Sequence, residues 1–181
     1  MTKEERLKRR AAARHRSYRR TWSGRLSRMA ERANARAKLH GIPGRVTTGE
    51  LQELLLEQGG RCALTGRSLT PDKPNALSHA SLDHIIGVNC GSGSATGTRD
   101  NLMMVRLTAN KMKGNMPLSS LFGETKPVLT EYMTEFMPVE RQRQVLELQA
   151  QQLRALGRQV SSDDYVVVKN LRRSPKRKTN Q

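Results

Sequence analysis

The spacing of apolar residues along the chain predicts mostly helices, with two short strands near the middle. Residues 2–20 are rich in Ala and Arg and begin with a Thr–Glu capping-box pair, so we expect a helix there with arginines on every side. A second helix is predicted over residues 23–40, because a thin apolar stripe recurs there at helical spacing before Gly41 and Pro43. The stripe consists of Leu26, Met29, Ala30, Ala33 and Ala37.

Three further helices and one strand are predicted outside the middle of the chain. Residues 47–58 begin with another capping-box pair, carry a leucine stripe and end at two glycines. Residues 127–137 have apolar side chains at helical spacing, and a proline in the first turn opens another helix over residues 138–156. Residues 165–168 indicate a short strand, and residues 172–181 form a polar, basic tail.

The middle of the chain predicts a strand, a polar loop, a second strand and a short helix. Residues 81–86 alternate in the manner of a half-buried strand, and residues 91–97 form a loop of Gly, Ser, Ala and Thr. Residues 102–105 are apolar enough for the second strand, and Thr108 is the predicted N-cap of a helix over residues 109–113. This small unit inside a mostly helical chain predicts an α+β fold.

Composition adds a large excess of positive charge to this picture. The 181 residues include 33 Lys and Arg but only 16 Asp and Glu, which gives a formal net charge of +17. Most of the excess lies in residues 1–46 and a smaller share in residues 161–181, whereas the middle is nearly neutral. Such a charge favours a polyanionic partner, of which nucleic acid is the commonest and an anionic membrane surface the main rival.

Several other classes of protein are disfavoured by the composition. Apolar residues make up 35% of the chain, and no run approaches the roughly 20 residues that a spanning helix needs. The first ten residues, MTKEERLKRR, lack the apolar stretch of a secretory signal peptide, so we expect a cytoplasmic protein. Two cysteines are too few for a disulfide framework or for a four-cysteine zinc site.

Four polar residues of the middle supply the groups that metal-assisted phosphodiester hydrolysis needs. Asp83 offers carboxylate oxygen and Asn110 amide oxygen, which suit Mg²⁺ as ligands. His84 has a side chain able to take a proton from water near neutral pH. Lys113 follows Asn110 by three residues on the same helix face and can neutralise phosphate charge. These are a Lewis-acid site, a general base and a phosphate clamp.

The order and spacing of these residues resemble the motif of the HNH endonuclease family in its His-Asn-Asn form. Asp83-His84 is followed by Asn101 and then, nine residues later, by Asn110 with Lys113 three further on. This spacing is similar to that of the HNH domain of RNA-guided CRISPR effectors and of small phage and intron-encoded HNH endonucleases. The preceding segment, residues 59–66, is similar to the Gly-x-Cys-x-x-Cys-Gly that often leads into the motif. The resemblance covers roughly residues 47–118.

The resemblance implies a ββα-metal fold and cleavage of DNA strands. By it, Asp83 and Asn110 would hold one Mg²⁺ or Mn²⁺ against the scissile phosphate. His84 would activate the attacking water and so leave 5′-phosphate and 3′-hydroxyl ends. Asn101 would pin the loop and orient the histidine's backbone, and Lys113 would contact phosphate. The fold is then a small ββα-metal HNH core in a mostly helical chain.

Two departures from the family pattern change the expected metals. Many relatives bind a structural zinc through two Cys pairs, but Thr65 stands at the second Cys position, and Cys62 and Cys90 alone cannot close a tetrahedral site. We therefore expect no structural zinc. Asn110 occupies the third motif position instead of His, which favours Mg²⁺ or Mn²⁺ over softer metals.

The resemblance and the charge together suggest four segments. These are a basic helical DNA-binding extension (1–46), the HNH nuclease core (47–123), C-terminal helices (124–160), and a short strand with a basic tail (161–181). The basic residues expected to contact DNA are Arg9, Arg10, Arg16, Arg19, Arg20, Arg25, Arg28, Arg106 and Lys111.

Several alternatives stay open at the level of sequence. A non-catalytic basic nucleic-acid-binding protein with a degenerate nuclease fold is the main alternative, and a peripheral membrane protein is a weaker one because the arginine helix has few aromatics. His79 is expected on the strand surface, and His15 and His40 in structural roles. The sequence does not choose between a monomer and a homodimer, between nicking and double-strand cleavage, or between homing, phage-genome processing and restriction in a bacterial or phage-infected cell.

Overall fold

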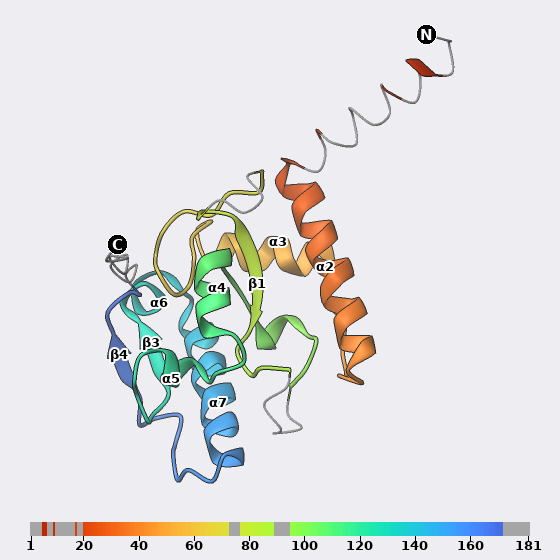
Figure 1. Cartoon of the computed structure of the whole chain (residues 1–181). Helices are drawn as coiled ribbons and strands as arrows, with labels where there is room; N and C mark the ends of the chain where they lie inside the picture. The colour runs from red at the N-terminus through yellow and green to blue at the C-terminus, as the bar shows by residue number, and fades with distance from the viewer. Residues whose placement is uncertain are drawn as a thin grey trace, which may run out of the picture.

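The computed structural model describes residues 20–72, 77–88 and 95–171, together with a few single residues nearer the N-terminus. Helices and short strands make up this part of the chain, which confirms the expected α+β class (Figure 1). Most of the helix predicted over residues 2–20 lies outside the described residues. In chain order the elements are α2 (Trp22–Leu39), α3 (Thr48–Glu57), β1 (Ala80–His84), the 3₁₀ helix η1 (Arg99–Asn101), β2 (Leu102–Arg106), α4 (Leu107–Lys113), α5 (Leu118–Leu121), β3 (Val128–Thr130), α6 (Glu131–Phe136), α7 (Val139–Ala155) and β4 (Val166–Val168).

The predicted strand–loop–strand–helix unit is present in the middle of the chain. β1 and β2 form an antiparallel pair in which Asp83 is paired with Met103 and His84 with Leu102. α4 follows β2 without a linker and packs against both strands. The unit lies between α2 on one side of the molecule and the β3–β4 pair on the other (Figure 1). Residues 89–94, which include most of the polar loop, lie outside the described residues.

The start of α4 differs from the prediction. The helix begins at Leu107, and its N-cap residue is Arg106, so the expectation that Thr108 caps the helix was wrong. The junction is held instead by the Leu107 N–H, which donates to the carbonyl of His79 across the strand pair at 2.9 Å. A tertiary hydrogen bond thus takes the place of a local side-chain cap.

The segment after Pro127 was predicted as one helix and is a strand followed by a helix. β3 pairs in parallel with β4, and all three residues of β3 are buried. Thr130 then caps α6 through a hydrogen bond from the Met133 N–H to Thr130 Oγ1. The helical spacing of apolar residues was misleading here because β4, almost 40 residues later, supplies the strand partner. The helix predicted after Pro138 and the strand predicted near Val166 are confirmed as α7 and β4.

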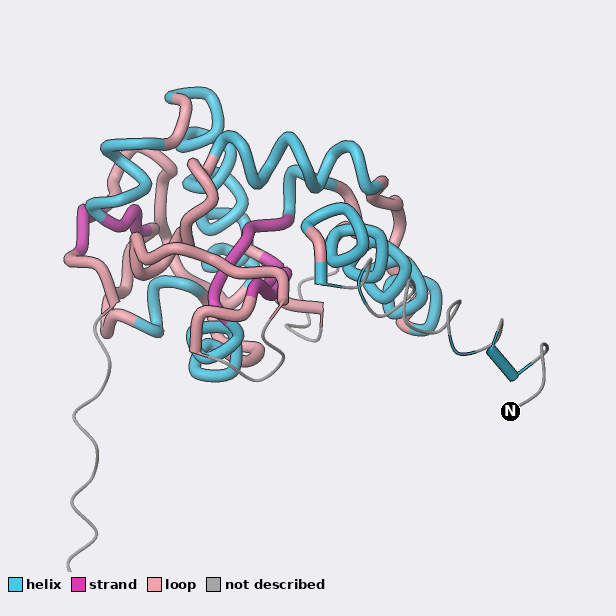
Figure 2. Tube along the Cα trace, turned by 90° about the horizontal axis from the view of Figure 1, so that it is seen from above, coloured by secondary structure: helices cyan, strands magenta, loops and turns pink. Residues whose placement is uncertain are grey.

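A single hydrophobic core joins α2, the middle unit and the C-terminal elements. The apolar stripe of α2 faces this core, so α2 is an integral part of it although the sequence suggested a DNA-binding extension over residues 1–46. Asn34 on α2 also exchanges two hydrogen bonds of 2.9 Å with the backbone of Val46, just before α3. Figure 2 shows the two strand pairs (magenta) in separate places among the helices. Among the described residues, no helix combines the length and apolar character needed to cross a membrane.

Buried glutamine side chains form hydrogen bonds with the backbone along one unpaired edge of each strand pair. On β2, the Gln58 amide accepts from the Met104 N–H at 2.9 Å and donates to the Met104 carbonyl at 2.8 Å. On β3, Gln149 makes the same two bonds with Val128, at 3.0 and 2.8 Å. A two-stranded sheet leaves backbone groups unpaired on both edges, and burying them without partners is costly. The glutamines therefore act as substitute strand neighbours.

We expect the Gln58→Leu substitution to lower the free energy of unfolding by about 2–3 kcal/mol, because the buried Met104 N–H loses its partner while side-chain volume is kept. Urea unfolding followed by circular dichroism measures the change. Gln52→Leu, on the exposed side of α3, is the matched control and should alter the free energy by less than about 0.5 kcal/mol. Equal effects of the two substitutions would show that the amide–backbone pair contributes nothing.

Candidate functional site

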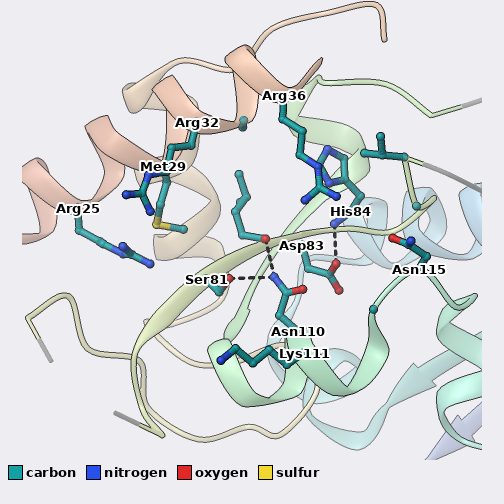
Figure 3. A pocket seen from close by; sticks show the side chains of 15 residues that line it. Arg25, Met29, Arg32, Arg36, Ser81, Asp83, His84, Asn110, Lys111 and Asn115 are labelled. Atoms are coloured by element: carbon teal, nitrogen blue, oxygen red, sulfur yellow. Dashed lines mark hydrogen bonds between the residues drawn. The ribbon is translucent and has the colours of Figure 1, made fainter. Parts of the chain in front are cut away.

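Asp83 and His84 are the last two residues of β1, next to the start of β2. The Asp83 side chain is only 5% exposed, and its Oδ1 accepts a hydrogen bond of 2.9 Å from the backbone N–H of His84. This bond fixes the orientation of the carboxylate at the end of β1. Figure 3 shows both side chains at the edge of one cavity.

Asn101 fixes the backbone that follows His84. Its side chain is fully buried; its Oδ1 accepts from the Ile86 N–H at 2.8 Å, and its Nδ2 donates to the Ile86 carbonyl at 3.2 Å. Nδ2 also donates to the carbonyl of Thr96 at 2.9 Å, at the far end of the loop. The residue thus ties together both ends of the loop that separates β1 from β2, and so restrains the position of His84.

Asn110 on α4 presents its carbonyl oxygen to the same place. Its Nδ2 donates to Ser81 Oγ at 2.9 Å and to the Leu82 carbonyl at 2.8 Å. The carbonyl of Leu82 only accepts hydrogen bonds, so the amide nitrogen must lie on that side. The Asn110 oxygen consequently points toward the Asp83 carboxylate (Figure 3).

Lys113 is buried beneath these residues. It is only 1% exposed, and its Nζ donates to the His84 carbonyl at 2.8 Å and to Asp83 Oδ1 at 3.3 Å. A direct contact with substrate phosphate, which the sequence predicted, does not fit this position because the ammonium faces the protein interior. Lys113 instead neutralises Asp83 and holds the end of β1.

One carboxylate oxygen of Asp83 has no hydrogen-bond partner in the part of the chain that the structure describes. Oδ2 is buried and accepts no hydrogen bond among the described residues, although the Lys113 ammonium lies 3.3 Å away. Burial raises the pKa of Asp83, while the charge of Lys113 acts in the opposite direction. An unsatisfied buried oxygen opposite an amide oxygen suits a hard cation. The described residues hold no cluster of three or more His, Cys, Asp and Glu side chains that could bind a metal, so a cation here would depend on Asp83, Asn110 and water or substrate oxygens.

His84 is a neutral imidazole at physiological pH. Burial, followed by the positive charges of Arg36 and Lys113, lowers the pKa of His84 to about 4. A neutral imidazole has a nitrogen lone pair available to accept a proton, which is the state that a general base requires.

The cavity beside these residues has a volume of about 340 Å³. One wall comes from β1 and α4, and the other from α2 (Figure 3). Of the basic residues predicted to contact DNA, Arg25 and Lys111 line this cavity. The Arg25 guanidinium also donates to the carbonyl of Ala80, and burial with the charges of Arg28 and Arg32 lowers the pKa of Arg25 to about 10.

The described residues among the other predicted DNA contacts do not line the cavity. Arg106 donates from Nε and Nη2 to the carbonyl of Ser68, at 3.2 and 3.0 Å. Arg28 is half-buried on α2 and does not line the cavity, while Arg9 and Arg20 are exposed near the N-terminus. Three of the predicted residues lie outside the described part of the chain: Arg10, Arg16 and Arg19.

Arg141 is a positioning residue that the sequence analysis missed. This α7 side chain is 3% exposed and donates to the carbonyls of Asp100 at 2.9 Å, Arg99 at 3.2 Å and Leu102. These three carbonyls flank Asn101 on both sides, so Arg141 holds the backbone that carries it. The sequence contained one signal of this burial. Arg141 precedes the apolar Val145 by four positions, and residues i and i+4 share a helix face.

The remaining expectations concern His79, the two cysteines and a structural zinc. His79 is buried, not on the strand surface as predicted, because its backbone lies where β1 meets α4. Cys62 is buried as a free thiol, as expected, and its Sγ accepts from the Arg106 N–H at 3.2 Å. Cys90 lies outside the described residues. The expected lack of a structural zinc stays a prediction.

Comparisons with known proteins give little beyond the geometry. No protein-family model and no curated protein matches the chain. Among solved structures, the chain is similar to the crystal structure of the Type II-C Cas9 enzyme from Actinomyces naeslundii, with 20% sequence identity and a TM-score of 0.34. The alignment covers 86% of this chain and 15% of that chain. A TM-score this low does not establish a common fold.

We expect the Arg36→Gln substitution to raise the pKa of His84, because it removes one of the positive charges that disfavour the imidazolium. An NMR titration of the His84 ring protons measures this pKa. In the wild-type protein the ring should stay neutral from pH 7 to below pH 5. Lys38→Gln removes a charge from the same helix away from the cavity and should leave the titration unchanged.

The lowered pKa of His84 makes the free energy of unfolding depend on pH. The folded pKa of about 4 lies below the ordinary value of 6.5, so the unfolded chain takes up this proton first as the pH falls. The contribution of His84 to stability is therefore complete above pH 6.5 and is lost as the pH falls toward 4. A wild-type His84 pKa near 6.5 would contradict the buried environment.

Proposed function

We propose that the protein is a metal-dependent HNH-type endonuclease that hydrolyses phosphodiester bonds of DNA. The observation that carries this proposal is the convergence of His84, Asp83 and Asn110 on one cavity, where Asp83 Oδ2 accepts no hydrogen bond from the described residues. A base, a carboxylate oxygen and an amide oxygen at one point are the groups that metal-assisted hydrolysis needs. The motif resemblance supports the same assignment.

Asp83 and Asn110 fit a divalent cation such as Mg²⁺ or Mn²⁺. Both present oxygen to the same point, and Asn110 is oriented by its two hydrogen bonds to β1. A cation held there would supply positive charge to the scissile phosphate and to the leaving 3′-oxygen.

His84 is the proposed general base. Its depressed pKa keeps the imidazole unprotonated at neutral pH, so a ring nitrogen can accept the proton of the attacking water. The water oxygen would then bond to phosphorus as the bond to the 3′-oxygen breaks, which leaves 5′-phosphate and 3′-hydroxyl ends.

Asn101, Lys113 and Arg141 act through the backbone that carries His84. Asn101 joins the two ends of the loop, Lys113 holds the His84 carbonyl, and Arg141 holds the carbonyls around Asn101. Geometry fixed in this way before substrate binds is worth a large factor in rate, because a misplacement of about 1 Å can cost about 100-fold. We propose DNA as the substrate because the chain carries a net charge of +17.

We expect the purified protein to convert supercoiled plasmid to nicked or linear DNA with Mg²⁺ or Mn²⁺, and EDTA to stop the reaction. His84→Ala should slow cleavage by about 100-fold or more, because the general base is lost. Gel electrophoresis over a time course measures both rates. Nicks that DNA ligase reseals without prior kinase treatment would verify the 5′-phosphate and 3′-hydroxyl ends.

His40→Ala is the matched control, since His40 is exposed at the end of α2 and away from the cavity. It should cut at the wild-type rate, and circular dichroism should show that both variants fold. Plasmid that stays supercoiled with each metal, or equal cleavage by His84→Ala, would overturn the proposal. Retained DNA binding in that case would favour the alternative of a non-catalytic nucleic-acid-binding protein.

A further inference from the structure

α2 lies outside the motif that defines the site and yet forms one wall of its cavity. The residues that α2 contributes to the lining include Arg25, Arg32 and Arg36 (Figure 3). Arg36 lies nearest to His84, and its charge is among the causes of the lowered pKa of that residue. The wall that faces the proposed catalytic groups is therefore basic.

Arg32 and Arg36 differ from Arg25 in how their side chains are engaged. Arg25 is half-buried and donates to the Ala80 carbonyl, whereas Arg32 and Arg36 are exposed. Within the ranges 20–72, 77–88 and 95–171, neither Arg32 nor Arg36 forms an ion pair with a carboxylate. Among the described residues that line the cavity, Asp83 is the only acid, and it is already paired with Lys113.

The spacing of the two arginines suits an extended ligand. Residues four apart lie on the same helix face, about 6 Å apart along the axis. A strand with repeated phosphates offers each of the two guanidinium groups a phosphate of its own. Guanidinium is also the side-chain group whose planar donors match phosphate oxygens best.

We propose that Arg32 and Arg36 form a phosphate-binding row that holds the DNA strand along α2, at phosphates adjoining the one that is hydrolysed. This inference rests on the proposed function for the identity of the scissile phosphate. The strand passes through the cavity between α2 and the β1–α4 wall. α2 thus has two faces with separate roles, an apolar face in the core and a basic face on the substrate.

Binding tests the row without any need for catalysis. The His84→Ala protein is mixed with a fluorescent DNA oligonucleotide in EDTA, and anisotropy is measured over a range of salt concentrations. Adding Arg32→Gln or Arg36→Gln should weaken binding about 5- to 10-fold and reduce the slope of log affinity against log salt by about 1. Lys38→Gln, which removes an equal charge from the same helix next to a different hollow, should change affinity less than twofold.

Cleavage tests whether the row binds neighbouring phosphates. Bis(p-nitrophenyl) phosphate contains one phosphodiester and no adjoining phosphate. Arg32→Gln or Arg36→Gln is introduced into the otherwise wild-type protein. Each substitution should lower the rate of oligonucleotide cleavage at least about fivefold more than it lowers the rate of cleavage of this diester. Equal losses on both substrates would assign the arginines to the scissile phosphate and overturn the row.

The outcomes separate this inference from the proposed function. If the wild type cleaves DNA and the two arginine variants match Lys38→Gln in binding, the row is wrong and the nuclease stands. If the wild type cleaves nothing but the arginine variants lose affinity and salt slope, α2 still binds a DNA strand and the nuclease assignment fails. Circular dichroism of the variants, whose substituted side chains are exposed, verifies that they fold.

Discussion

The need to pair backbone N–H and C=O groups in very short strands governs much of this structure. Among the described residues each strand pair has only two strands, so the buried strands β2 and β3 would each leave backbone groups without partners on one edge. Side-chain amides pair with backbone groups at four places, two of them in strands and two in loops, and each exchanges two hydrogen bonds with one residue's backbone. The pairs are Asn34 with Val46, Gln58 with Met104, Asn101 with Ile86, and Gln149 with Val128. Gln58 and Gln149 thus take the place of neighbouring strands, while Asn34 and Asn101 pair with backbone groups in loops.

The candidate site uses the same device at the place where precision matters most. Asn101 is one of the four amides, and it determines where the chain turns after His84. Arg141 on α7 and Lys113 on α4 add charged donors to neighbouring carbonyls, so two helices restrain the backbone of the site. The hydrogen bonds that hold the loop between β1 and β2 therefore also restrain His84.

Local patterns in the sequence predicted those elements that local interactions determine. The capping box before α3, the apolar β2 strand and the proline ahead of α7 all depend on residues close together in the chain, and each prediction was confirmed. β3 was mistaken for helix because its partner β4 comes almost 40 residues later. The motif selected Asp83, His84 and Asn110, which line one cavity. The burial of Lys113 and the basic wall of α2 depend on tertiary packing that spacing alone does not encode.

The positive charge around Asp83 has a thermodynamic consequence. The Lys113 ammonium and the α2 arginines disfavour a free divalent cation at the proposed site and favour an anionic strand. A phosphate that enters the cavity offsets this repulsion, so a cation would bind more tightly to the protein–DNA complex than to the protein alone. Linkage is reciprocal, and the cation would raise the affinity for DNA by the same factor. The cavity would therefore bind the cation and the DNA strand with positive cooperativity. In the absence of nucleic acid it would hold a cation only weakly.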